Sequence, residues 1–265
     1  MRIVCLSAEA ADICARLGAW GEVVAVSAFA SQRGLERRPV VAGFSTGDAA
    51  KVAALAPDLV ITFSDVQAAM AAELIRRGCA VLATNQRSLA EIAQTIRLIG
   101  GAIGRATEAA ALADEFASAV EKLRSSAEPQ PRVYFEEWPE PPISGIGWVG
   151  EIVELCGGTD VFAERRGKAS REREVTIAEI VAANPDIIIA SWCGKPVDLD
   201  SIRRRDCFDR IAAVRSGELH ALDSDSILQP GPRVLDGART IRGIFDAWRA
   251  RRPLRSCIAR ALPPT

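Results

Sequence analysis

The sequence predicts an α/β protein of two lobes with mainly parallel sheets flanked by helices, joined by one long α-helix, with a ligand cleft between the lobes. The first observation is a phrase that occurs twice, at residues 51–62 and 179–190, in which a short apolar helix stops at Pro-Asp and a β-branched run follows. The residue before proline is disfavoured in the α conformation, so each helix ends there, and each run is typical of a buried parallel strand. The second observation is a long stretch without any strand pattern between the two copies, at residues 88–124.

The first lobe is expected over residues 1–85. Apolar runs predict strands at residues 3–6, 23–26, 59–62 and 80–83, and helices are predicted at residues 8–17 and 66–77. A polar loop is expected at residues 29–39. Because strands alternate with helices along the chain, the strands should form βαβ units and therefore a parallel sheet.

The connector is expected over residues 86–126. Apolar residues between 89 and 123 recur mostly at steps of three and four, which indicates an amphipathic helix. A continuous helix of this length would span about 55 Å, at about 1.5 Å per residue. Gly100, Gly101 and Gly104 interrupt the pattern, and either a kink or a closely packed neighbour would account for them.

The second lobe is expected over residues 131–250, followed by a tail at residues 251–265. A strand is predicted at residues 132–135, then a proline-rich loop, a helix at residues 149–155 and an exposed charged loop at residues 164–174. The second copy of the repeated phrase follows. A strand at residues 218–222 and a helix at residues 234–249 complete the lobe.

Composition limits the partners and the compartment. A net charge of −1 argues against a nucleic-acid partner, and the chain contains no apolar run of about 18 residues that would insert into a membrane. The apolar run after Met1 and Arg2 is too short for a secretory signal, and seven cysteines are dispersed without a CxxC pair. We therefore expect a cytoplasmic protein, with a periplasmic one as the alternative if a signal peptide had been removed.

Each repeated strand is followed by an aromatic residue, Phe63 in the first lobe and Trp192 in the second. Ligands in open α/β sheets bind beyond the carboxyl ends of the strands. The two aromatic side chains are therefore predicted to face each other across a cleft that holds a large, flat molecule.

Several motifs together resemble a known family. They are residues 2–7 (RIVCLS), 56–61 (APDLVI), 154–158 (ELCGG), 184–188 (NPDII) and 231–233 (GPR), in this order around the long helix. The pattern, which covers about residues 2–250, resembles the cobalamin-binding proteins of ABC-type importers. These belong to the helical-backbone (class III) substrate-binding proteins, which also include haem, ferric-siderophore and metal binders.

The resemblance implies non-catalytic binding of cobalamin or another corrinoid between the lobes. A corrin has a broad apolar face and a rim of amides, so its site needs flat apolar walls and a few polar groups. The positions that match the family's apolar walls and its amide-binding carboxylate are Phe29, Phe44, Phe63, Pro142, Ile143 and Asp225. Loop position alone adds Trp138 and Trp192, and Gln229 is a candidate amide partner.

The chain departs from the importer pattern at two positions. Importer proteins usually carry a glutamate seven residues before each repeated proline, and these carboxylates dock on arginines of the permease. Here the positions are Ala50 and Ala178, although Glu179 is adjacent to the second. Permease docking is therefore doubtful, and the expected role is that of a cytoplasmic carrier or store.

Other interpretations remain open. A different flat chelate, haem or a ferric siderophore, is the first alternative, and a regulatory or interaction protein on the same fold is the second. His220 and Cys193 are possible cobalt ligands, but we expect a sheet histidine and a bystander thiol. Glu136 and Glu137 are adjacent in a strand and point to opposite faces, so they form no acid/base pair. An enzyme is not expected.

Overall fold

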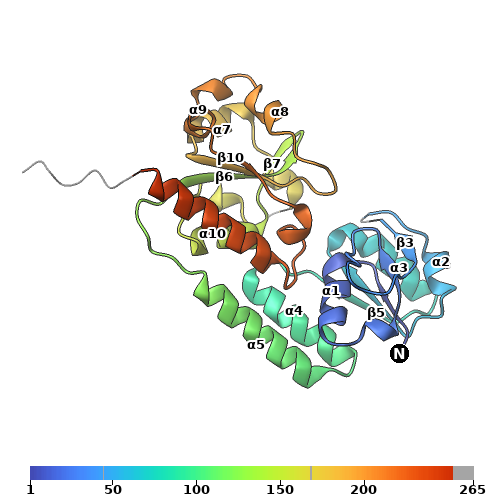
Figure 1. Cartoon of the computed structure of the whole chain (residues 1–265). Helices are drawn as coiled ribbons and strands as arrows, with labels where there is room; N and C mark the ends of the chain where they lie inside the picture. Colours follow the sequence, from blue (N-terminus) through green and yellow to red (C-terminus); the bar gives the residue numbers. More distant parts are fainter. Residues whose placement is uncertain (44, 168, 253–265) are drawn as a thin grey trace, which may run out of the picture.

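The computed structural model describes residues 1–43, 45–167 and 169–252, and it contains two α/β lobes connected by a pair of helices (Figure 1). The sheet of the N-terminal lobe has the order β3-β2-β1-β4-β5, and every pairing in it is parallel. The strands are β1 (Ile3–Cys5), β2 (Val23–Ser27), β3 (Val40–Ala42), β4 (Leu59–Phe63) and β5 (Val81–Thr84). The predicted parallel sheet is confirmed.

Helices cover both faces of this sheet. They are α1 (Ala8–Arg16), α2 (Ala49–Ala53) and α3 (Ala68–Arg76), with 3₁₀ turns η1 (Trp20–Glu22) and η2 (Asp65–Gln67). In β1 the side chains of Ile3 and Cys5 pack into the core on one face, while Val4 packs into a second cluster on the other. Both faces of β1 are thus buried, which explains why the strand is a continuous apolar run rather than an alternating one.

The sheet of the C-terminal lobe has the order β10-β9-β6-β7, with β8 also paired to β6. Its strands are β6 (Arg132–Pro139), β7 (Pro142–Ser144), β8 (Thr159–Asp160), β9 (Ile187–Ala190) and β10 (Leu219–Ala221). The hairpin between β6 and β7 is antiparallel, and the other pairings are parallel. The prediction of a mainly parallel sheet is confirmed here as well.

The helices of this lobe are α6 (Gly147–Leu155), α7 (Ile177–Ala183), α8 (Leu199–Arg203), α9 (Ala212–Ser216) and α10 (Val234–Ala250), with 3₁₀ turns η3 (Ala163–Arg165), η4 (Ser170–Arg173), η5 (Phe208–Arg210) and η6 (Ser224–Ser226). The guanidinium of Arg242 in α10 donates to the backbone oxygen of Leu123 and so ties this lobe to the connector. From residue 253 onward the predicted tail lies outside the described residues.

The prediction of one long connecting helix is wrong. The connector consists of two helices, α4 (Leu89–Ala102) and α5 (Ala106–Lys122), which lie side by side after a reversal of the chain (Figure 1). Gly104 adopts φ +71°, in the left-handed region that ends helices, and this breaks the apolar stripe that the sequence pattern carries across the turn. Gly100 permits the close packing, because a Cβ there would lie 2.0 Å from the Cβ of Ala109.

Gly100→Ala is expected to lower the free energy of unfolding by about 1–3 kcal/mol, because the added methyl group overpacks the contact between α4 and α5. Gly101→Ala in the same helix is the matched control. A Cβ at Gly101 meets no atom within 4 Å, so this variant should gain about 0.5–1 kcal/mol from helix propensity. Urea unfolding of both variants measures the difference. Equal effects at the two positions would contradict the packing role of Gly100.

Among the helices of the described residues, none combines the length and hydrophobicity needed to cross a bilayer.

Candidate functional site

A cleft of about 620 Å³ lies between the lobes and is lined by residues from both. The N-terminal lobe contributes the first turn of α1 and the segments that follow β2, β4 and β5. The C-terminal lobe contributes the end of β6, the start of α6 and the loops after η3, β9 and β10. Most of these segments follow the carboxyl ends of parallel strands, where ligands of open α/β sheets bind. The volume falls within the range of about 300–1,000 Å³ that is usual for small-molecule sites.

Three of the predicted aromatic residues line this cleft: Phe29, Phe63 and Trp138. The Arg87 guanidinium lies over the Phe63 ring, 5.5 Å from its centroid. The Lys195 Nζ lies over the Trp138 ring, 4.1 Å from its centroid. The Phe29 ring extends from the N-terminal lobe to the other lobe, since a Cβ on Gly194 would lie 3.0 Å from its Cε1 atom. Aromatic surface therefore comes from both lobes.

Trp192 does not face Phe63 across the cleft, and this prediction is wrong. Its side chain is 6% exposed and belongs to the core of the C-terminal lobe. Its Nε1–H donates to Glu136 Oε1 at 3.0 Å, and the same carboxylate accepts from Tyr134 and Arg205. A buried carboxylate must be matched by donors, and the indole N–H is one of them. Burial and the nearby Glu136 raise the pKa of Tyr134 well above its usual value, so its hydroxyl remains a donor.

Pro142 and Ile143 are half-buried in β7 and do not belong to the described lining of the cleft. Ile143 pairs with Trp138 across the hairpin, so β7 supports the strand that carries the aromatic wall. Phe44 lies outside the described residues. The sequence prediction missed Trp148, which lines the cleft at the start of α6 while its Nε1–H donates to the backbone oxygen of Ile227 at 2.8 Å.

Gln229 lines the cleft, and its Nε2–H donates to Asp225 Oδ1 at 2.9 Å and to the backbone oxygen of Phe29 at 3.3 Å. The second bond crosses from one lobe to the other. Asp225 belongs to η6 and is not among the described lining residues. Burial, reinforced by the charge of Asp223, raises the pKa of Asp225. The predicted amide partner is therefore at the cleft, with the predicted carboxylate one hydrogen bond away.

The two arginines of the described lining are both paired with carboxylates. Arg87 Nη2 lies 3.0 Å from Asp65 Oδ1, and Arg173 Nη1 lies 2.6 Å from Glu137 Oε2. Arg173 is 2% exposed and fixed in place, because it also donates to the backbone oxygen of Ser144. Glu136 and Glu137 have separate partners: Glu136 accepts from Tyr134 and Trp192 in the core of the C-terminal lobe, whereas Glu137 pairs with Arg173 at the cleft.

Glu9 in the first turn of α1 is a cleft residue that the sequence prediction missed. Its side chain is 4% exposed, and within the described residues its Oε1 has no hydrogen-bond partner. Burial raises the pKa of Glu9 to about 7, against smaller opposing effects of the Ser7 hydroxyl and its own backbone N–H. The available signal was a glutamate inside the otherwise apolar start of the first helix.

His220 is a sheet residue, as expected: it lies in β10 with Nε2 3.0 Å from Glu218 Oε2. Cys193 lines the cleft. The residue is exposed at the cleft surface, and partial desolvation there, with the charges of Glu137 and Asp225, raises the pKa of its thiol, so the neutral form dominates at neutral pH. Within the described ranges no group of three or more His, Cys, Asp or Glu side chains could hold a metal ion.

The two positions at which the resemblance to importer proteins would place docking glutamates are exposed alanines. Ala50 lies in the first turn of α2, and Ala178 lies in the first turn of α7. The neighbouring Glu179 is already engaged, since its Oε2 accepts from the Thr176 backbone N–H at 2.7 Å and its Oε1 pairs with Arg165. This hydrogen bond is the main reason that the pKa of Glu179 is lowered.

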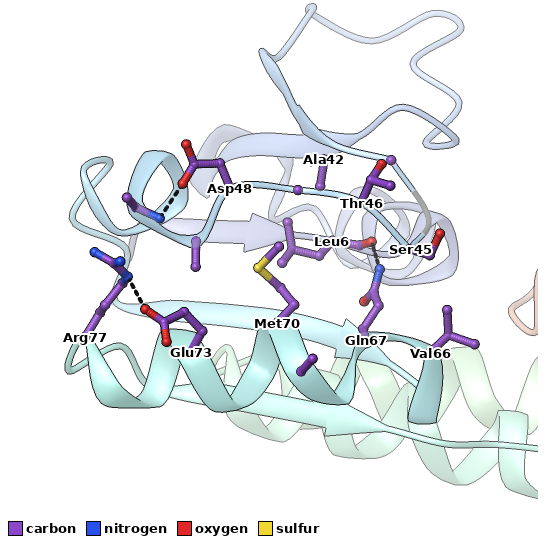
Figure 2. Close-up of a pocket in the computed structure, with 15 residues that line it drawn as sticks. Leu6, Ala42, Ser45, Thr46, Asp48, Val66, Gln67, Met70, Glu73 and Arg77 are labelled. Atoms are coloured by element: carbon purple, nitrogen blue, oxygen red, sulfur yellow. Dashed lines mark hydrogen bonds and ion pairs between the residues drawn. The ribbon is translucent and has the colours of Figure 1, made fainter.

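A second cavity of about 570 Å³ lies within the N-terminal lobe, between α3 and the segment that joins β3 to α2. Figure 2 shows Met70 of α3 directed toward Ala42 and Asp48, with the Gln67 amide donating to the Leu6 backbone oxygen at 2.8 Å. At one end Glu73 pairs with Arg77. Asp48 caps α2 by accepting from the Ala50 N–H, so the charged groups Asp48, Glu73 and Arg77 around this cavity already have structural roles.

Residues 3–226 match the periplasmic binding protein family. The vitamin B12-binding protein of Vibrio cholerae is 26% identical over 247 residues, covering 91% of this chain and 87% of that protein. The crystal structure of the periplasmic vitamin B12-binding protein of Vibrio cholerae gives a TM-score of 0.75 at 22% identity, covering 95% of this chain and 98% of that one. A periplasmic haem-binding protein of Roseiflexus gives a TM-score of 0.80 at 21% identity, covering 92% and 97%. The two structural likenesses establish the two-lobe fold.

Proposed function

The chain belongs to the periplasmic binding protein family, and on this premise we propose that it binds a corrinoid, cobalamin or a derivative, in the cleft between its lobes. The protein is a non-catalytic substrate-binding protein of the type whose members bind vitamin B12, haem or siderophores. The corrinoid acts as the bound ligand rather than as a cofactor for a reaction.

The chemistry of the cleft surface supports this choice. Phe29, Phe63 and Trp138 supply aromatic faces from both lobes, which suit the flat apolar face of a corrin. Within the described lining, the groups that can pair with carboxamides include the side chains of Asn85, Glu9 and Ser27 and the side-chain oxygen of Gln229. The arginines that would attract the propionates of haem are already held by Asp65 and Glu137.

Haem is the second candidate. The haem-binding protein of Roseiflexus resembles this fold as closely as the vitamin B12-binding protein does, and Cys193 places a sulfur donor in the cleft. A cysteine can ligate haem iron only as a thiolate. In the ligand-free cleft the raised pKa of Cys193 keeps its thiol protonated.

Titration calorimetry with hydroxocobalamin is expected to show binding at about one ligand per chain, and the corrin absorption bands should stay with the protein after desalting. The reason is the aromatic, amide-compatible surface of the cleft. Haemin titrated under the same conditions is the control for a different flat chelate. Heat with haemin alone would transfer the assignment to the haem alternative, and heat with neither ligand would favour an interaction protein on this fold.

We further propose that the protein acts in the cytoplasm as a carrier or store and does not dock on an importer. Complementary charges on two lobes orient a docked complex and steer encounter, and the exposed Ala50 and Ala178 supply none. Fused to a secretion signal, the chain is expected not to restore growth on limiting cobalamin in a strain that lacks its importer binding protein. The Ala50→Glu/Ala178→Glu variant is the matched control. Restored growth with the unmodified chain would contradict the docking argument, and cell fractionation tests the compartment.

A further inference from the structure

Glu9 occupies the part of the cleft where the two lobes meet. The first turn of α1 approaches the C-terminal lobe closely, since a Cβ on Gly231 would lie 2.8 Å from the Glu9 Cβ. A second contact between the lobes lies nearby in the chain, where Gln86 Nε2 donates to the backbone oxygen of Pro230 at 2.9 Å. Glu9 and Pro230 both belong to the cleft lining, so a ligand held between the lobes reaches this junction.

The carboxyl of Glu9 differs from the other acidic groups of the lining. Asp65 is paired with Arg87 and Glu137 with Arg173, whereas Glu9 Oε1 is buried without a hydrogen-bond partner among the described residues. Ser27 also lines the cleft, and its buried Oγ likewise has no hydrogen-bond partner among the described residues. Buried polar groups without partners are unfavourable and rare in native proteins. Two of them at the surface of one cleft indicate that the ligand provides the missing partners.

We propose that Glu9 is a specificity-determining residue, whose carboxyl pairs with a primary carboxamide on the rim of the bound corrinoid and disfavours a carboxylate at the same place. The inference rests on the proposed corrinoid function and names the chemical group that the cleft selects. A primary amide carries N–H donors and a C=O acceptor, so it forms two hydrogen bonds with a protonated carboxyl and at least one with an ionised carboxylate. A ligand carboxylate has no donor, and against an ionised Glu9 two buried anions would face each other.

Two corrinoids that differ only in their rim test this proposal. Dicyanocobinamide carries amides, whereas dicyanocobyrinic acid carries carboxylates on the same corrin and cobalt. At pH 7.5 the unmodified protein is expected to prefer dicyanocobinamide by about 10- to 100-fold, because an unmatched buried polar pair is strongly disfavoured. Visible absorption titrations give the dissociation constants.

The Glu9→Gln variant keeps the size and shape of the side chain but removes its charge. A glutamine amide forms two hydrogen bonds with a ligand amide, so the affinity for dicyanocobinamide should stay within about threefold. The glutamine also offers an N–H to a carboxylate. Dicyanocobyrinic acid should therefore bind to the Glu9→Gln variant about tenfold more tightly than to the unmodified protein. Glu9→Leu should weaken dicyanocobinamide about tenfold. Glu73→Gln, which removes a carboxylate of the same lobe outside the cleft, should change neither constant.

The outcomes separate the two levels of the proposal. An unchanged preference in Glu9→Gln, with dicyanocobinamide still bound, would overturn the role of Glu9 and leave corrinoid binding intact. Binding of neither corrinoid by the unmodified protein would overturn the proposed function, and the role of Glu9 with it. We expect the preference for dicyanocobinamide over dicyanocobyrinic acid to become smaller in Glu9→Gln and to stay unchanged in Glu73→Gln.

Discussion

Arg205→Met is expected to lower the free energy of unfolding by about 3–5 kcal/mol, because it leaves a buried carboxylate without its compensating charge. Glu136 is 0% exposed, and Arg205 Nη2 lies 2.9 Å from its Oε1, with a second contact from Nη1 to Oε2. The hydroxyl of Tyr134 and the indole of Trp192 satisfy the remaining acceptor positions but carry no charge. Without the guanidinium, the ionised carboxylate would be stabilised by two neutral donors alone.

Urea unfolding followed by tryptophan fluorescence measures this loss. Arg203→Met is the matched control, since Arg203 pairs with Asp200 on the exposed surface of α8 and such a pair contributes about 0–1 kcal/mol. In the double variant Glu136→Gln/Arg205→Met the charge itself is removed, so stability should partly return. Equal losses at Arg203 and Arg205 would show that the buried network does not carry the stability assigned to it.

Glu9→Gln is expected to become more stable than the unmodified protein as the pH rises, by up to about 3 kcal/mol at pH 8. Burial raises the pKa of Glu9 from its ordinary value of 4.5 to about 7. Between these two values the folded state holds a proton that the unfolded state has released, so the stability of the unmodified protein falls through this window. The contribution of the neutral carboxyl is fully present below pH 4.5 and lost above about pH 7.

The difference in unfolding free energy between Glu9→Gln and the unmodified protein, measured from pH 4 to 8, should therefore grow with pH. Glu9→Leu is the control for side-chain chemistry, because it also lacks the proton and should show the same pH dependence with a constant offset. A difference that does not change with pH would mean that Glu9 titrates alike in the folded and unfolded chains.

Residues 51–62 and 179–190 show what local sequence patterns could predict. The helices α2 and α7 end before Pro57 and Pro185, and the preceding residues Ala56 and Asn184 leave the right-handed helical region with φ +46° and +42°. The strands β4 and β9 follow at the expected places and are paired on both sides. Proline sterics and burial on both faces act over a few residues, so the sequence carried this information directly.

The connector shows where periodicity was insufficient. The apolar residues of α4 and α5 keep nearly the same spacing across the turn at residues 103–105, because both helices bury one face. Gly104 marked the break, but its left-handed conformation became evident only from the packing of α5 on α4. Amphipathic spacing records that a face is buried, not which partner buries it.

By itself the sequence determined the two mainly parallel sheets, the helix ends at the repeated Pro-Asp phrase, and the placement of Phe29, Phe63 and Trp138 at or near the carboxyl ends of strands. The tertiary structure alone decided which side chains reach the cleft. Trp192 lies just after β9 and Phe63 at the end of β4, yet the Trp192 side chain turns to Glu136, which lies 56 residues away in the chain. Glu9 stands in an ordinary first turn, yet the approach of Gly231 from the other lobe buries it. Both outcomes depend on long-range partners that satisfy or bury polar groups, and no local pattern encodes such partners.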